Sequence, residues 1–268
     1  MNTTYLGRGD YWFSLLTAGA RPHAGLCASV KAADGEIAGR PARYIAVVPD
    51  AANHFPRAAL GEVGLLEGWT LDWVVSEAVA QDADKAEKRA IVAIVDVPSQ
   101  AYGRREEAFG IHQSLAGAAA AYAKARLAGH PVIALIVGKA MSGAFLAHGY
   151  QANQLIAFND PAVMVHAMGK ESAARITLRS VAALETLAQT IAPMAYDIEN
   201  YATLGLLAQL LDIAHPDQAG EDEIRRVRAA LADAVDKAGR QGVDLSNRRG
   251  ADNRRSSQLV RERMRQEW

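Results

Sequence analysis

The sequence predicts an α/β protein built around a mostly parallel sheet. Two continuous apolar runs, residues 90–98 (AIVAIVDVP) and 130–138 (HPVIALIVG), are typical of strands that are buried on both faces. Between them lies a long Ala-rich stretch, residues 105–129, which indicates a helix that ends at a glycine. A strand, a helix and a strand in this order indicate a βαβ unit with a right-handed crossover.

The N-terminal part predicts a β-meander followed by a helix. Short β-branched runs in residues 25–50 are separated by two turn signals, Asp34-Gly35 and residues 39–41 (GRP). Residues 67–88 then place apolar side chains at helical spacing. We therefore expect short strands and one helix before the βαβ unit.

The segment after the second buried strand continues the alternation. Residues 138–149 (GKAMSGAFLAHG) open a helix that we expect to reach Tyr150. Two further strands, residues 154–158 and 162–167, are separated by an Asn-Asp-Pro turn. The pattern of the last third is helical, and the expected helices cover residues 172–177, 181–191, 198–211 and 221–238.

We expect one domain over residues 1–238 and a basic C-terminal tail over residues 239–268. Residues 246–268 hold seven arginines against three acidic residues, with little apolar surface. Such a segment is either a solvated helix or frayed terminus, or a docking surface for an acidic partner.

The composition excludes several classes of protein. The chain has 268 residues, 50% of them apolar, which is enough for one sizeable domain. The formal net charge is −1, so no global field favours nucleic acid or a membrane surface. The single cysteine, Cys27, excludes a disulfide framework and a zinc site built on several thiolates. Because the N-terminus does not resemble a signal peptide and no segment is apolar enough to cross a bilayer, we expect a cytoplasmic protein.

The turn within residues 138–149 is the first candidate for chemistry. A Gly-rich turn that opens a helix presents unpaired backbone N–H groups, which attract negative charge. The spacing of a phosphate-binding loop, G-x-x-x-x-G-K-[ST], is absent. Three interpretations stay open: an oxyanion cradle made by the N–H groups of Gly143 and Ala144, a nucleophilic Ser142, and close helix–strand packing alone.

A nucleophilic serine needs a base, and His166 is the candidate because it ends a later strand of the same sheet. This Ser-then-His order is similar to that of Clp-type serine peptidases, in which a bulky residue separates the serine from the glycine. Here Met141 precedes Ser142 and Gly143 follows it directly. We therefore interpret Ser142 as a turn residue or positioning hydroxyl rather than as a nucleophile.

A second turn, residues 95–112, is similar to the D-[TV]-P-G-x-x-x-G-x-x-x-E element of acyl-CoA carboxyltransferase subunits. Ser99 stands where that element has its first glycine, and the matching residues are Asp96, Pro98, Gly103 and Glu107. Gly103 offers a close approach to the backbone, and Arg104 could attract a phosphate or carboxylate. We therefore count Gly103, Arg104 and Met141 as candidate substrate-binding residues.

Together, residues 97–153, 159–177 (NDPAVMVHAMGKESAARIT) and 192–207 (APMAYDIENYATLGLL) resemble the malonate decarboxylase gamma subunit family. The resemblance is strong from about Ile91 to Leu207 and looser in the N-terminal meander. It implies a crotonase-like ββα spiral of the ClpP/crotonase type, with a helical C-terminal part.

The resemblance also implies partners and a substrate. The partners are a beta subunit of related fold, an acyl-carrier (delta) subunit and an acyltransferase (alpha) subunit. The carrier holds malonate as a thioester on a phosphopantetheine-type arm derived from dephospho-CoA, and the beta–gamma pair releases CO2 and leaves acetyl on the carrier. The chain itself would bind no cofactor directly. In an alternative, biotin-dependent version the carboxyl group passes to a biotin protein.

The chemistry of this reaction suits the first turn. Loss of CO2 from a malonyl thioester leaves an enolate, whose charged oxygen backbone N–H donors can stabilise. No metal is required, in agreement with the lack of a Cys/His cluster at ligand spacing. The proton for the product carbon could come from His166, from Ser142 through a water, or from the beta subunit. Whether Gly143 and Ala144 hold the enolate or the departing carboxyl stays open.

Overall fold

A single sheet forms the centre of the computed structural model, which describes residues 7–249 and 251–268. Its strands follow the order β1-β2-β3-β4-β5-β7, and β6 pairs with the end of β4. The β1–β2 pair is antiparallel, and the other described pairs are parallel. The strands are β1 (Val30–Ile37), β2 (Arg40–Val47), β3 (Ala90–Val97), β4 (Val132–Met141), β5 (Gln154–Phe158), β6 (Met164–His166) and β7 (Gln209–Leu211).

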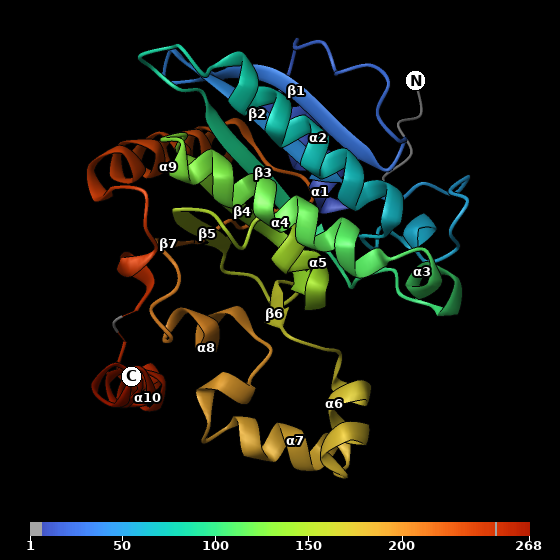
Figure 1. The fold of residues 1–268 in the computed structure, drawn as a ribbon, viewed down its shortest axis with the longest axis vertical. Coiled ribbons are helices and arrows are strands. Elements are labelled where there is room, and N and C mark those ends of the chain that lie inside the picture. Colours follow the sequence, from blue (N-terminus) through green and yellow to red (C-terminus); the bar gives the residue numbers. More distant parts are fainter. Residues whose placement is uncertain (1–6, 250) are drawn as a thin grey trace.

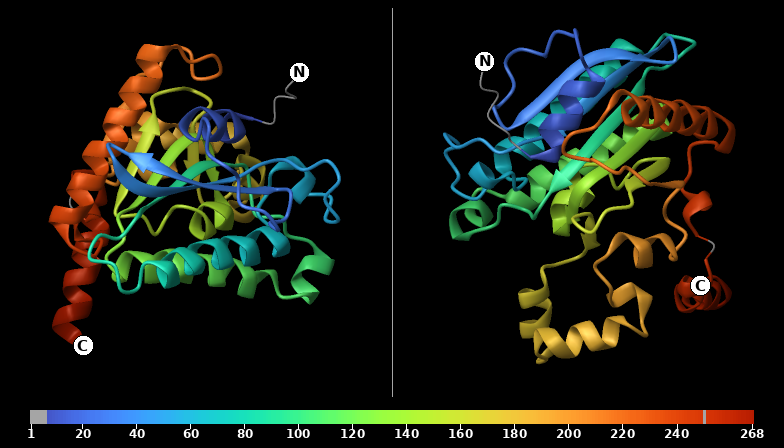
Figure 2. Two further views of the ribbon diagram at one scale, coloured as in Figure 1. Left: turned by 90° about the horizontal axis from the view of Figure 1, so that it is seen from above. Right: turned by 180° about the vertical axis from the view of Figure 1, so that it is seen from behind.

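Helices cover both faces of this sheet. The pair α2 (Leu65–Gln81) and α4 (Ile111–Leu127) covers one face, and α1 (Arg8–Leu16) and α9 (Glu221–Gln241) pack on the other (Figures 1 and 2). The remaining α-helices extend away from the sheet in Figure 1 or connect its strands. They are α3 (Arg104–Ala108), α5 (Ser142–Ala147), α6 (Lys170–Thr177), α7 (Val181–Ala188), α8 (Ile198–Ala202) and α10 (Arg255–Glu267).

The core confirms the two strands that the apolar runs predict. Residues 91–95 of β3 and 132–137 of β4 have no exposed surface. Burial of each large aliphatic side chain contributes roughly 1.5–3 kcal/mol. The helices above them approach closely at Gly68 of α2, where a Cβ atom would lie 2.1 Å from Oγ of Ser114 on α4. The Ser114 hydroxyl is satisfied there because it donates to the Leu65 carbonyl at 2.8 Å.

The predicted N-terminal meander is a single hairpin. Asp34-Gly35 does not form a turn but lies within β1, and the chain reverses at Ala38-Gly39. Asp34 can stay in a strand because its carboxylate accepts a hydrogen bond from Nε of Arg43, its cross-strand partner, at 2.8 Å. A cross-strand ion pair thus replaces the turn that the Asp-Gly pair predicts.

Several predicted helices are shorter than expected. The helix predicted over residues 105–129 is divided into α3 and α4 by Gly110, which has φ of 80°. The helix predicted over residues 198–211 ends at Ala202, and residues 209–211 form β7 against β5. The helix expected to reach Tyr150 ends at Ala147. Residues 209–211 have a helical local pattern, but they form a strand because they pair with the exposed backbone edge of β5.

The first helix, α1, is not among the elements predicted from the sequence. Trp12 on this helix is fully buried and donates from Nε1 to the Pro216 carbonyl at 2.9 Å. Arg8 bonds Asp217 through Nε (2.9 Å) and Nη2 (2.8 Å), and Asp160 through Nη1 at 2.7 Å. These contacts connect the helix to loops far away in the sequence, so no local pattern could indicate them.

Candidate active site

The turn between β4 and α5 lies at the carboxyl end of the parallel sheet. β4 continues past Gly138 to Met141 because β6 pairs with its last three residues, and Met141 lies opposite His166. The strand pairing therefore brings Ser142 and His166 to the same edge of the sheet, as the sequence predicts. Carboxyl ends of parallel strands are the usual place for ligands in such sheets.

Ser142 and Gly143 direct two donors to one oxygen atom. Ser142 has φ of 60°, a conformation that costs a non-glycine residue roughly 1–2 kcal/mol. Its hydroxyl donates to Oε1 of Gln100 at 2.9 Å, and the Gly143 N–H donates to the same atom at 2.7 Å. The turn therefore accommodates an oxygen that carries partial negative charge, and Gln100 supplies that oxygen.

The Asp96 carboxylate holds the end of β4, just before this turn, by hydrogen bonds to backbone N–H groups. Its Oδ1 accepts a hydrogen bond from the Lys139 N–H at 3.0 Å, and its Oδ2 accepts one from the Gly9 N–H at 3.3 Å. A Cβ atom at Gly138 would lie 2.2 Å from Oδ1, so only glycine leaves room for this carboxylate. Asp96, which matches the carboxyltransferase element, thus connects α1 to the end of β4.

A cavity of about 660 Å³ opens beside the turn. Its wall is largely apolar, with a few polar groups, as expected for a small-molecule site. One of the lining residues is Tyr201, whose buried hydroxyl has no hydrogen-bond partner among the described residues. The lining residues are Gln100, Tyr102, Ser142, Gly143, Phe145, Leu146, Tyr150, Val165, His166, Ala167, Met168, Ser172, Ile176, Pro193, Ala195, Tyr201 and Leu204.

His166 enters this cavity as a half-buried imidazole. Its ring stacks on Tyr196, with the centroids 3.9 Å apart, and its Nδ1 lies 3.0 Å from the Met168 carbonyl oxygen. Burial lowers the pKa of His166, so the ring is neutral near neutral pH. The Ser142 hydroxyl bonds Gln100, and no Ser142–His166 hydrogen bond exists between these two described residues. The arrangement therefore lacks the nucleophile–base contact of a serine hydrolase.

Three of the residues predicted for the site line the cavity together: Ser142, Gly143 and His166. Ala144 follows directly in α5 but is fully buried, and it does not line the cavity. Met141 is also buried, 5% exposed, and is not one of the residues that line the cavity.

Gly103 and Arg104 lie at the start of α3, outside the cavity lining, whereas their neighbour Tyr102 belongs to it. A Cβ atom at Gly103 would lie 2.4 Å from Oε2 of Glu106, so a glycine there leaves room for this buried carboxylate. Arg104 is exposed. The substrate-binding role of these two residues stays a prediction.

Sequence reasoning missed Gln100, Tyr196 and Tyr201. Gln100 had a usable signal, because it is a polar residue three positions after β3 ends, at the edge of the sheet where ligands bind. The two tyrosines come from a helical region distant in sequence, and their positions depend on how that region folds back under β6.

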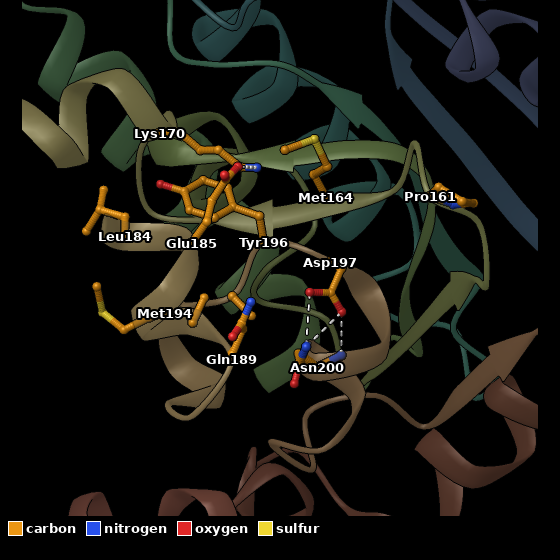
Figure 3. Close-up of a pocket in the computed structure, with 12 residues that line it drawn as sticks. Pro161, Met164, Lys170, Leu184, Glu185, Gln189, Met194, Tyr196, Asp197 and Asn200 are labelled. Atoms are coloured by element: carbon orange, nitrogen blue, oxygen red, sulfur yellow. Dashed lines mark hydrogen bonds and ion pairs between the residues drawn. The ribbon is translucent and has the colours of Figure 1, made fainter. Parts of the chain in front are cut away.

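A second, smaller cavity of about 340 Å³ has Tyr196 in its lining (Figure 3). Its polar residues bond one another: Lys170 pairs with Glu185 at 2.7 Å, and the Asp197 carboxylate accepts the Asn200 N–H at 2.8 Å. The Tyr196 hydroxyl donates to the Met168 carbonyl at 2.9 Å. This region therefore holds Tyr196 against His166.

The C-terminal segment reaches the back of the active-site cavity. Arg248 is buried and donates from Nη1 to the Tyr150 carbonyl at 2.9 Å. Its guanidinium carbon Cζ lies 5.0 Å from the centroid of the Tyr150 ring. Further on, four arginines surround a hollow of about 290 Å³ beside α10; they are Arg249, Arg254, Arg261 and Arg265. The boundary at residue 238 and the docking role of the tail stay predictions.

Within residues 7–249 and 251–268, no group of three or more His, Cys, Asp or Glu side chains could hold a metal ion. In the same part of the chain, no helix is both long and apolar enough to span a bilayer.

The matching family model and two similar solved structures all concern malonate decarboxylase. The family model described as malonate decarboxylase gamma subunit matches residues 58–268. A Pseudomonas malonate decarboxylase hetero-tetramer, solved in complex with coenzyme A, contains a chain 58% identical to this one; the match covers 97% of this chain and 99% of that chain, with a TM-score of 0.94. The Pseudomonas MdcD–MdcE hetero-dimer gives 55% identity, coverage of 98% and 100%, and a TM-score of 0.91.

More distant relatives extend the comparison. A malonyl-S-ACP:biotin-protein carboxyltransferase, MADD, of Malonomonas rubra is 36% identical over 163 residues, which is 60% of this chain and 56% of that protein. Transcarboxylase 12S is 19% identical over 85% of this chain and 41% of its own, with a TM-score of 0.63. The likeness to the transcarboxylase shows the fold alone, and it confirms the crotonase-like carboxyltransferase fold that the sequence predicts.

Proposed function

This chain belongs to the malonate decarboxylase gamma subunit family, and we propose that it pairs with a beta subunit of related fold to remove CO2 from a malonyl thioester. Likeness over nearly the whole chain to one subunit of a malonate decarboxylase supports this proposal. The single observation that carries the site is the cavity of about 660 Å³ where Ser142, Gly143 and His166 meet at the carboxyl end of β4 and β6.

The substrate we propose is malonyl carried on an acyl-carrier (delta) subunit, loaded by an acyltransferase (alpha) subunit. The related hetero-tetramer was crystallised with coenzyme A, which carries the same kind of phosphopantetheine arm as such a carrier. The arm would enter the largely apolar cavity beside the turn. The chain itself binds no cofactor in this scheme, and the expectation of a cytoplasmic location stays a prediction.

In the reaction the bond between the malonyl C2 carbon and the carboxylate carbon breaks. CO2 leaves, and the electron pair moves into the thioester, which becomes an enolate; one proton then adds to carbon to give acetyl. Donors placed in advance around the charged oxygen stabilise the transition state more than the ground state, and one such donor typically contributes roughly 3 kcal/mol. Beside the cavity, the Ser142 hydroxyl and the Gly143 N–H both donate to Oε1 of Gln100.

His166 is the group of this chain that we propose as the proton donor. Its Nδ1 lies 3.0 Å from the Met168 carbonyl oxygen, which can only accept a hydrogen bond, so Nδ1 carries the proton of the neutral ring. Burial lowers the pKa of His166, and Nε2 must therefore first take up a proton before it can deliver one to the product carbon. Stacking on Tyr196 keeps the ring in place.

The test is to purify the chain alone and with its beta partner, and to follow CO2 release from malonyl-CoA or malonyl-carrier. We expect release only from the pair. Esterase activity of the chain alone that is lost in Ser142→Ala would instead support a Clp-type serine hydrolase, a function that the Ser142–Gln100 hydrogen bond disfavours.

The second candidate is a carboxyltransferase subunit that passes the carboxyl group to a biotin protein. The likeness to MADD favours it, although that match spans only 56% of the relative. The pair should be assayed with and without free biotin as acceptor. CO2 release that does not change when biotin is added supports the biotin-independent reaction.

A further inference from the structure

Gln100 has its side-chain amide fixed in one orientation. The Gly143 N–H can only donate, so the atom 2.7 Å from it must be the carbonyl oxygen Oε1 of Gln100. The Ser142 hydroxyl donates to the same oxygen at 2.9 Å. A flipped amide would place its NH2 group against a backbone donor, which costs a hydrogen bond and adds repulsion.

Backbone hydrogen bonds to Val63 fix the position of the chain on both sides of Gln100. Val63 donates to the Ser99 carbonyl at 3.0 Å and accepts from the Ala101 N–H at 2.8 Å, so the residues on both sides of Gln100 are held. Gly143 leaves room for the side chain, because a Cβ atom there would lie 2.3 Å from Oε1.

The other end of the amide is open to the cavity. Gln100 lines the cavity, and its Nε2 has no hydrogen-bond partner among the described residues. Nor is Nε2 a buried orphan: in the described part of the chain, such atoms occur only in His130, Tyr201 and Arg248. Nε2 therefore keeps two N–H donors accessible to solvent, on a side chain that lines the cavity.

We propose that Gln100 contacts the substrate, with Nε2 donating to an anionic oxygen of the malonyl group. The inference rests on the proposed function. In this arrangement the Gly143 N–H and the Ser142 hydroxyl act on the substrate through Gln100, because donation to Oε1 polarises the amide and strengthens its N–H donors. The amide is already oriented, so it needs no reorganisation when charge develops.

The anionic oxygen is either the malonyl carboxylate or the enolate oxygen. A carboxylate contact exists in the ground state, so its loss raises KM; an enolate contact exists only in the transition state, so its loss lowers kcat. Both variants below are therefore assayed for both constants with malonyl-CoA as the probe, in the assembled beta–gamma pair.

Gln100→Met removes both donors at similar volume, and we expect kcat/KM to fall about a hundredfold. In Gln100→Glu the ionised carboxylate cannot donate, whereas the protonated acid can. The rate of Gln100→Glu relative to wild type should therefore rise as pH falls through the titration of the new carboxyl, while the relative rate of Gln100→Met stays constant with pH. Gln218→Met, on the exposed loop before α9, is the matched control and should behave like wild type.

Wild-type kinetics in Gln100→Met would overturn the inference, and so would faster turnover, since Gln100 would then only block the turn. A Gln100→Glu rate that parallels Gln100→Met at every pH would also count against it. Because the acid rescue is a change with pH that Gln100→Met does not show, a loss of folded protein that is the same at every pH cannot imitate it. If the wild-type pair releases no CO2, the proposed function itself fails.

Discussion

The substitution Gly143→Ala tests how the turn, Gln100 and activity depend on one another. The added Cβ atom would lie 2.3 Å from Oε1 and 3.1 Å from Cδ of Gln100, whereas Cδ1 of Leu115 is at 3.6 Å, an ordinary contact. Only the Gln100 amide must therefore move. Gly143 is not among the residues with positive φ, so alanine brings no backbone strain.

The magnitude follows from the bonds that are lost. Displacing Gln100 breaks two hydrogen bonds to Oε1, each with a net contribution of about 1 kcal/mol, so the free energy of unfolding should fall by about 2 kcal/mol. Activity should fall by about two orders of magnitude, because the oriented donor is lost. The assays are urea unfolding of the chain and CO2 release from malonyl-CoA by the beta–gamma pair.

The matched control is Gly239→Ala, in the last turn of α9. Nothing lies within 4 Å of its added Cβ atom, so alanine should stabilise the helix by about 1 kcal/mol and leave turnover unchanged. A double-mutant cycle with Gln100→Met gives the decisive result. If Gly143 acts through Gln100, the second substitution adds little to the first; additive losses, or wild-type turnover in Gly143→Ala, would refute the reasoning.

Three further predictions follow from other parts of the structure. Burial lowers the pKa of His148 to about 4, so the unfolded chain, with a pKa of about 6.5, binds the proton first as pH falls. Between pH 6.5 and 4 this effect should lower the free energy of unfolding by about 3 kcal/mol in the wild type but not in His148→Gln, as measured by urea titrations at several pH values. Ser142→Ala removes one hydrogen bond to Gln100 and should lower turnover about tenfold; a ten-thousandfold loss in the CO2 assay would point to a nucleophile instead. Deletion of residues 255–268 should leave Tm and malonyl-CoA turnover unchanged but raise KM for the carrier protein at low salt, because exposed arginines are lost. Equal carrier KM values for the truncated and full chains across salt concentrations would contradict a docking role.

The sequence predicted the centre of the molecule well. The residues of β3 and β5, and the turn after β4, lie where the apolar runs and the glycines place them. These segments are buried on both faces, so their pattern is a direct consequence of their environment. The meeting of Ser142 and His166 was also predictable, because neighbouring parallel strands end at the same edge.

The elements that the sequence predicted poorly depend on distant partners. Asp34 lies in a strand because Arg43 faces it, and residues 209–211 form a strand because β5 offers an unpaired edge. A local pattern holds no information on either partner. The local preference for a turn or a helix was therefore overridden by contacts formed only in the folded chain.

By itself, the sequence determined the α/β class, the family and the turn at Ser142 and Gly143, since these follow from burial periodicity, local turn geometry and residue motifs. Only the tertiary structure decided what this turn faces. It placed Gln100 on the donors that Gly143 and Ser142 supply, and it packed Tyr196 against His166. The reason is physical: a backbone N–H is present at almost every residue, and its partner depends on which distant side chain the fold brings within hydrogen-bond distance.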